Sequence, residues 1–204
     1  MNRRKMLGSL GVGLLAILSG CLTENSLPGG NDSPTDHPPA EFETFQTGPL
    51  SHLPEGVRHD TADTPQMGYA DALVFTESSD VLTTLPEETM LKEYRFEDLI
   101  ANQRGTVKEF IGETNDNNEL LIALFSRWPK TNPNGIEVLE LQRNDDTITG
   151  TAAVDGHDPE GGDDTPMTPA ALIRVTVGSE RPDTVALTIT DGFELEHEVD
   201  VKVE

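Results

Sequence analysis

Hydrophobic and polar residues alternate over short periods in the second half of the chain. Residues 119–125 are a continuous apolar run, which is typical of a strand buried on both faces. Later segments alternate apolar and polar side chains, as strands with one buried and one wet face do. The predicted strands are residues 69–76, 119–125, 136–141, 147–154, 171–177, 184–190 and 193–203. Their spacing predicts a mainly β fold, an antiparallel sandwich or a barrel-like sheet.

Two segments before the apolar run suggest helices. Residues 103–113 place three apolar side chains on one face. Residues 80–85 suit a short helical turn, which Pro86 would stop. Residues 86–101 fit a helix or a strand. We therefore expect one or two short helices near the start of the β-rich domain.

The first 22 residues have the layout of an export signal. Arg3, Arg4 and Lys5 form a positive segment, an apolar run with three glycines follows, and small residues precede Cys21. This order is typical of a secretory signal peptide. The paired arginines indicate the twin-arginine variant, an address for the export of folded proteins.

The segment Leu18, Ser19, Gly20 and Cys21 resembles the lipobox of prokaryotic lipoproteins. The resemblance implies that a membrane lipid alkylates the Cys21 thiol and that cleavage leaves Cys21 as the new first residue. The residue types suit this chemistry, because small side chains admit a peptidase and a thiolate is a strong nucleophile. The alternative is an uncleaved membrane helix, but residues 6–22 number only seventeen, fewer than the roughly 20 that span a bilayer.

Three segments are expected: a signal peptide (residues 1–20), a disordered tether (21–64) and a β-rich extracellular domain (65–204). Proline, glycine and aspartate interrupt every periodic pattern in the tether. Few large apolar residues are available there to offset the entropy of ordering. The exceptions, which could pack on the edge of the domain, are Phe42, Phe45, Leu50 and Leu53.

The charge of the chain excludes one class of partner. There are 37 Asp and Glu against 14 Lys and Arg, a formal net charge of −23. Nucleic acid should be repelled, since its binding needs clustered Lys and Arg. Two explanations are open: an acidic surface that binds cations or a basic partner, or adaptation to high salt, where dense carboxylates keep the surface hydrated. Low lysine content and the twin-arginine leader favour the second.

Cys21 is the only cysteine. If it carries lipid, the mature domain has no thiol, which excludes a thiol enzyme, a zinc–cysteine site and an iron–sulfur protein. The sequence contains no signature of a nucleophile elbow, a phosphate-binding loop, a zinc protease or a dinucleotide site. The histidines are scattered and are interpreted as surface residues; His197 is assigned to the polar face of the last strand. We expect no catalytic residue and no cofactor.

The best candidate for a metal site is the acidic loop after residue 154. Its carboxylates could surround a hard cation such as Ca²⁺, and its glycines permit the bend. The candidate ligands are Asp155, Asp158, Glu160, Asp163 and Asp164. Because the spacing differs from that of an EF-hand, a solvated acidic loop is the alternative. Residues 115–119 can likewise be interpreted as a cation-binding segment or as a solvated acidic segment.

Trp128 ends the apolar strand beside Arg127. An exposed tryptophan in this position could anchor a peptide or a sugar. We favour the other interpretation, a tryptophan packed at the edge of the core.

The order of motifs between residues 110 and 191 resembles that of small exported domains. It comprises a Thr-Asx turn (114–116), an apolar strand (120–122), a Pro/Gly turn (133–135), an Ile-x-Val strand (136–138) and the segment Thr-Pro-Ala-Ala-Leu-Ile-Arg-Val (168–175). The pattern is similar to haloarchaeal lipoproteins with twin-arginine leaders and, more distantly, to the C-terminal domain of the protease-complex subunit PrcB. The resemblance implies a β-rich accessory or binding domain without catalysis, and it transfers no functional residue.

Together these features predict a lipoprotein that is anchored through Cys21 and faces the extracellular side of the cell membrane. Its β domain would bind a partner protein or another envelope component. Two alternatives are a substrate-binding lipoprotein of a transporter, which usually has two lobes around a cleft, and a hydrolase with dispersed carboxylates.

Overall fold

A computed structural model describes residues 39–50, 53–55, 57, 68–87, 105–129, 135–156 and 165–204. These residues belong to one compact unit, Asp36–Glu204. Its elements are β1 (Phe42–Gln46), β2 (Ala70–Phe75), α1 (Ser78–Thr84), α3 (Val107–Gly112), β3 (Glu119–Ser126), β4 (Gly135–Asn144), β5 (Thr147–Asp155), β6 (Ala170–Thr176), β7 (Thr184–Thr190) and β8 (Glu196–Lys202).

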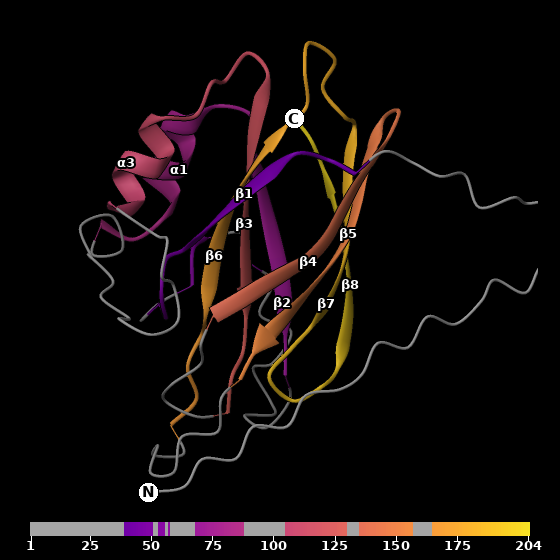
Figure 1. The fold of residues 1–204 in the computed structure, drawn as a ribbon. Coiled ribbons are helices and arrows are strands. Elements are labelled where there is room, and N and C mark those ends of the chain that lie inside the picture. The colour runs from indigo at the N-terminus through magenta and orange to yellow at the C-terminus, as the bar shows by residue number, and fades with distance from the viewer. Residues whose placement is uncertain are drawn as a thin grey trace, which may run out of the picture. The chain divides into compact units, whose positions relative to one another are not determined.

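The strands form two four-stranded sheets. The inner sheet has the order β1-β6-β3-β2, and the outer sheet has the order β4-β5-β7-β8. The sheets pack face to face, and α1 and α3 lie against the other face of the inner sheet, which gives three layers (Figure 1). The prediction of a mainly β fold, a sandwich or a barrel-like sheet with one or two short helices, is confirmed, and the described residues form a sandwich with two helices.

One strand pair departs from the antiparallel expectation. β5 and β7 are parallel, with Ile148 opposite Val185. In the chain they are separated by β6, which belongs to the inner sheet. Alternation along a strand indicates which side chains face the core, but it does not indicate which strand lies alongside.

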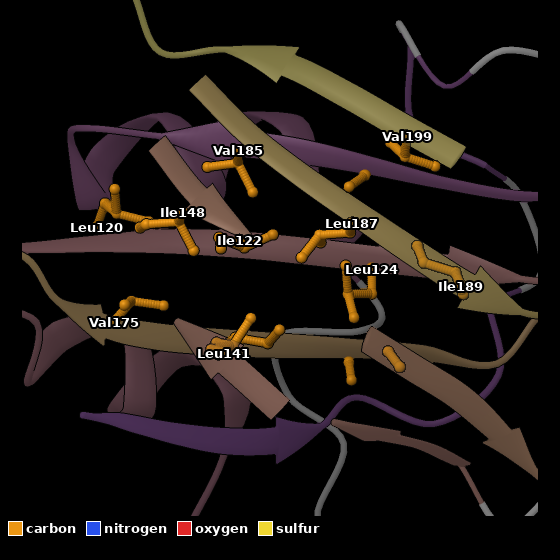
Figure 2. Close-up of a cluster of buried hydrophobic side chains, with 14 of the residues drawn as sticks. Leu120, Ile122, Leu124, Leu141, Ile148, Val175, Val185, Leu187, Ile189 and Val199 are labelled. Atoms are coloured by element: carbon orange, nitrogen blue, oxygen red, sulfur yellow. The ribbon is translucent and has the colours of Figure 1, made fainter. Parts of the chain in front are cut away.

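Two clusters of buried side chains join the three layers. Ile122 and Leu124 of the inner sheet meet Ile148 and Ile189 of the outer sheet, all fully buried (Figure 2). The second cluster lies under the helices and includes Phe125. Burial of one such side chain contributes about 1.5–3 kcal/mol. β3 supplies both clusters from its alternate residues, as the continuous apolar run predicts.

The folded unit begins earlier than the sequence predicts. β1 lies within the expected tether of residues 21–64, yet it pairs with β6 at the edge of the inner sheet. Phe45 and Leu50 are buried in the cluster under the helices, whereas Phe42 is exposed. An edge strand needs only a few inward apolar residues, so the composition of a long window does not reveal it. Residues 1–38, which include the expected signal peptide and the start of the tether, lie outside the described residues.

A side chain closes the gap between the two sheets at β1 and β4. Gln46 Nε2 donates to the Ile136 carbonyl at 2.7 Å, and Gln46 Oε1 accepts from the Ile136 N–H at 3.0 Å. The Ala40 N–H donates to the Leu141 carbonyl at 2.9 Å. The edge of β4 therefore has part of its backbone paired, which fixes the position of this strand relative to the inner sheet.

Candidate functional site

No described helix or strand covers the outer face of the outer sheet (Figure 1). The strand register arranges the outward side chains in four rows, each of which runs from β4 through β5 and β7 to β8. One row is Asn144, Thr147, Thr184 and Lys202. The three rows that carry carboxylates are Gln142, Thr149, Ala186 and Asp200; Glu140, Thr151, Thr188 and Glu198; and Glu137, Ala153, Thr190 and Glu196. We refer to this surface as the trough.

Charge is segregated across the trough. Within these rows the central strands β5 and β7 contribute only threonine and alanine, which form the floor; Asp155, which has the same parity as Ala153, lies past the last row at the end of β5. The edge strands contribute the carboxylates, which form its two walls: Glu137 and Glu140 on β4, and Glu196, Glu198 and Asp200 on β8. Lys202, at the end of β8, lies in the neighbouring row with Thr184, Thr147 and Asn144, and it is the one basic residue with outward parity in the described outer sheet.

The trough is hollow because short floor side chains stand between longer wall side chains. Its hollow measures ≈ 380 Å³ and is lined by the two rows nearer Asp200, including Glu140, Thr151, Thr188 and Glu198. Threonine hydroxyls can both donate and accept hydrogen bonds, and their methyl groups offer a small apolar surface. A ligand that combines polar groups with short hydrocarbon chains can therefore bind in the trough with its polar groups hydrogen-bonded.

A β-bulge shapes the β4 wall. The register between β4 and β5 shifts between Val138 and Glu140, so Leu139 has no partner in the ladder. Leu139 is 58% exposed, the largest exposure among the large hydrophobic residues of the described chain. Bulges commonly redirect a side chain, and this one adds an apolar side chain beside the carboxylate of Glu140.

The β8 wall is positioned by a buried carboxylate in the turn between β7 and β8. Asp191 Oδ1 accepts from the N–H groups of Phe193 and Leu195 at 2.8 and 3.0 Å, and Asp191 Oδ2 lies 2.7 Å from His197 Nε2. The Asp191 side chain is fully buried, and the His197 side chain is 25% exposed. Three donors on one carboxylate fix both the turn and the first residues of β8.

The assignment of His197 to the polar face is wrong. His197 pairs with Ile189 and has the same parity as the buried Val199, so its side chain points toward the inner side of β8. The polar face of this strand carries the glutamates. The alternation of residues 193–203 places His197 on the same face as Val199 and Val201, whereas the two flanking glutamates favour the opposite assignment.

Trp128 lies at the end of the sandwich. Its backbone pairs with Met167, and its ring lies against Gly156 after β5 and Gly192 after β7. A methyl group at Gly192 would come within 2.1 Å of the ring and 2.8 Å of the Arg127 carbonyl, so this position needs glycine. The indole Nε1 is buried and has no hydrogen-bond partner among the residues that the structure describes. This arrangement agrees with a tryptophan packed at the edge of the core.

The predicted cation ligands are mostly outside the described residues. Asp158, Glu160, Asp163 and Asp164 lie there, whereas Asp155 is the last residue of β5, opposite Gly135. Within the described part of the chain, no group of three or more His, Cys, Asp or Glu side chains could hold a metal ion.

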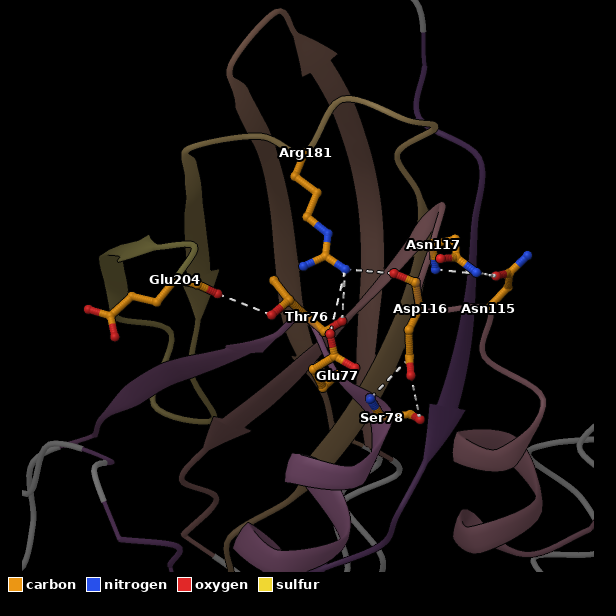
Figure 3. A network of polar contacts seen from close by, with 8 residues as sticks. All are labelled: Thr76, Glu77, Ser78, Asn115, Asp116, Asn117, Arg181 and Glu204. Carbon is orange, nitrogen blue, oxygen red and sulfur yellow. Dashed lines mark hydrogen bonds and ion pairs between the residues drawn. The ribbon is translucent and has the colours of Figure 1, made fainter.

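The second acidic segment, residues 115–119, uses its oxygens for protein contacts. Asp116 accepts from the N–H and the hydroxyl of Ser78 at 3.0 and 3.1 Å, which caps α1 (Figure 3). Arg181 donates to the carbonyls of Asp116 and Thr76 at 2.6 and 3.2 Å. Glu119 Oε2 accepts from the Asn115 N–H at 2.7 Å. These contacts give the segment a structural role in joining α1, β2 and the loop before β7.

The residues predicted for export and lipidation, namely Arg3, Arg4, Leu18, Ser19, Gly20 and Cys21, lie outside the described residues. In the described part of the chain, no helix has the length and apolar character needed to cross a bilayer.

The sequence analysis does not predict the trough, although the sequence does indicate the outward threonines that form its floor. The outward threonines of β5 and β7 follow from the alternation in residues 147–154 and 184–190. Their adjacency depends on the parallel β5–β7 pair, which joins segments separated by a strand of the other sheet. Comparison of the chain with protein-family models, curated proteins and solved structures finds no significant match, so its function is argued from this surface.

Proposed function

We propose that the chain is an exported lipoprotein, held on the extracellular side of the cell membrane by a lipid on Cys21, and that its β sandwich is a non-catalytic binding domain for an envelope partner. The observation that supports the binding role is the uncovered, hollow outer face of the outer sheet. The inner sheet is covered on both faces and contributes the core, whereas the outer sheet presents one whole face to a partner. The leader and the acidic composition support export in a high-salt organism, similar to the haloarchaeal lipoproteins.

The anchor is tested by comparing wild type with Cys21→Ser in a halophilic host that has twin-arginine export. Intact mass should show loss of residues 1–20 and gain of lipid for wild type only, and wild type alone should partition with membranes. An unlipidated wild-type protein released into the medium would refute the anchor.

The binding role is tested on membranes that carry the full chain at native salt. Thr151→Tyr with Thr188→Tyr fills the floor of the trough with residues that suit a strand. The matched control is Ser79→Tyr with Thr83→Tyr, two exposed positions on α1. Quantitative cross-linking should lose its specific partner in the floor variant and keep it in the helix variant. Equal cross-linking in both variants would exclude the trough as the binding surface.

A further inference from the structure

We infer that the trough binds an extended run of consecutive lysine or arginine residues in a partner protein. This inference rests on the proposed binding function and names the chemistry of the partner. Charge complementarity is the first reason, because five carboxylates stand on the two walls and one lysine stands at one end. Such a surface attracts a basic segment and speeds its association.

The placement of the carboxylates is the second reason. Hydration in high salt would be served by acidic residues on any outward position of the sheet. Within the three rows that carry carboxylates, the two central strands carry none and the acids form two rails along β4 and β8; Asp155, the last residue of β5, lies beyond these rows, opposite Gly135. The rails are three strand spacings apart, about 14 Å. The acids of β8 repeat every two residues, about 6.7 Å, and the bulge in β4 places Glu137 and Glu140 opposite Ala153 and Thr151, which are also two residues apart.

An extended basic segment matches both distances. If its backbone lies above the floor between β5 and β7, each wall is about 7 Å from its axis. A lysine side chain reaches about 6 Å, and consecutive residues of an extended chain point to opposite sides. Each wall then meets every second residue of the segment, at the same period of about 6.7 Å as the acids.

The floor and the bulge accommodate the rest of such a segment. The hydroxyls of Thr151 and Thr188 lie between the walls, where they can hydrogen-bond its backbone. The methylene stems of lysine can lie along the threonine methyl groups of the floor, and the exposed Leu139 of the bulge adds apolar surface on the β4 edge strand. A helical run of basic residues rises only about 1.5 Å per residue and points its side chains in all directions around its axis, so it would not match the period of about 6.7 Å along the walls.

The test uses fluorescence anisotropy of two labelled peptides with equal charge, titrated with the full chain over a series of KCl concentrations. One peptide is hexalysine; the other has six lysines separated by single glycines, so that in an extended conformation all its amines lie on one side. Hexalysine should bind more tightly and weaken with rising salt. Equal affinities for the two peptides, or displacement of hexalysine by equimolar spermine, would overturn the inference of an extended polypeptide.

Matched variants separate the trough from the general charge of the chain. The triple variant Glu140→Gln with Glu198→Gln and Asp200→Asn should weaken hexalysine binding by about tenfold, because it removes three exposed charge contacts that each contribute modestly to the affinity. The control, Glu55→Gln with Glu87→Gln and Glu180→Gln, removes the same charge from exposed positions and should change the affinity less than about twofold. Equal effects of the two variants would refute the inference. If the two charge variants have equal effects but Thr151→Tyr with Thr188→Tyr still abolishes cross-linking to the partner, the inference of a basic partner is refuted and the proposed binding function stands.

Discussion

Replacement of Asp191 by alanine tests what positions the β8 wall of the trough. The change removes a fully buried carboxylate that accepts hydrogen bonds from the N–H groups of Phe193 and Leu195 and contacts His197. A hydrogen bond to a charged group contributes about 1.5–3 kcal/mol. Because the three bonds share one carboxylate, and water can reach His197, the losses are not additive and the expected total is about 3–5 kcal/mol.

Urea and thermal unfolding of the full chain measure this loss. A destabilisation of about 3 kcal/mol should lower Tm by about 6–12 °C in a unit of this size. Asp191→Asn keeps an oxygen for the two backbone donors and should lose only about 1–2 kcal/mol. A stability of Asp191→Ala within about 0.5 kcal/mol of wild type would contradict the role of the carboxylate in the turn.

Three further predictions concern the helix layer and the end of the sandwich. Arg174 donates to the Phe110 carbonyl at 3.1 Å, and its guanidinium carbon lies 4.5 Å from the centre of the Phe110 ring. Arg174→Ala should therefore lower the free energy of unfolding by about 2 kcal/mol and speed hydrogen exchange in α3. Unchanged exchange would contradict this role of Arg174. Thr106→Ala removes the capping box of α3 and should cost about 1 kcal/mol in urea unfolding, whereas Thr106→Ser should cost little. Burial raises the pKa of Tyr69 above 10.0, against the smaller effect of its hydrogen bond with Thr168, so above pH 10 the folded state binds more protons than the unfolded state. Stability should therefore be full below about pH 10 and fall as pH rises through the raised pKa, and urea unfolding at pH 9 and 11 should show a smaller fall for Tyr69→Phe.

The sequence was informative where a pattern reports burial. The run at residues 119–125 predicted a strand with two buried faces, and β3 contributes to both core clusters. It was uninformative where the structure depends on which strands are neighbours. β1 was assigned to the tether because its partner, β6, lies more than a hundred residues away, and the adjacency of β5 and β7 has no local signal. The trough, which depends on that adjacency, was missed for the same reason.

Two arginines and the carboxylates of the trough have different roles in the described domain. Arg174 and Arg181 donate to backbone carbonyls and stabilise the contacts between elements, so the fold depends on them. The carboxylates of the trough project from strands whose opposite side chains form the core, and neighbours such as Glu198 and Asp200 on β8 repel each other. Neutralising these acids should therefore leave the free energy of unfolding equal or slightly higher. A loss of hexalysine binding in the Glu140, Glu198 and Asp200 variant, with unchanged urea unfolding, would then report the surface itself and not a damaged fold.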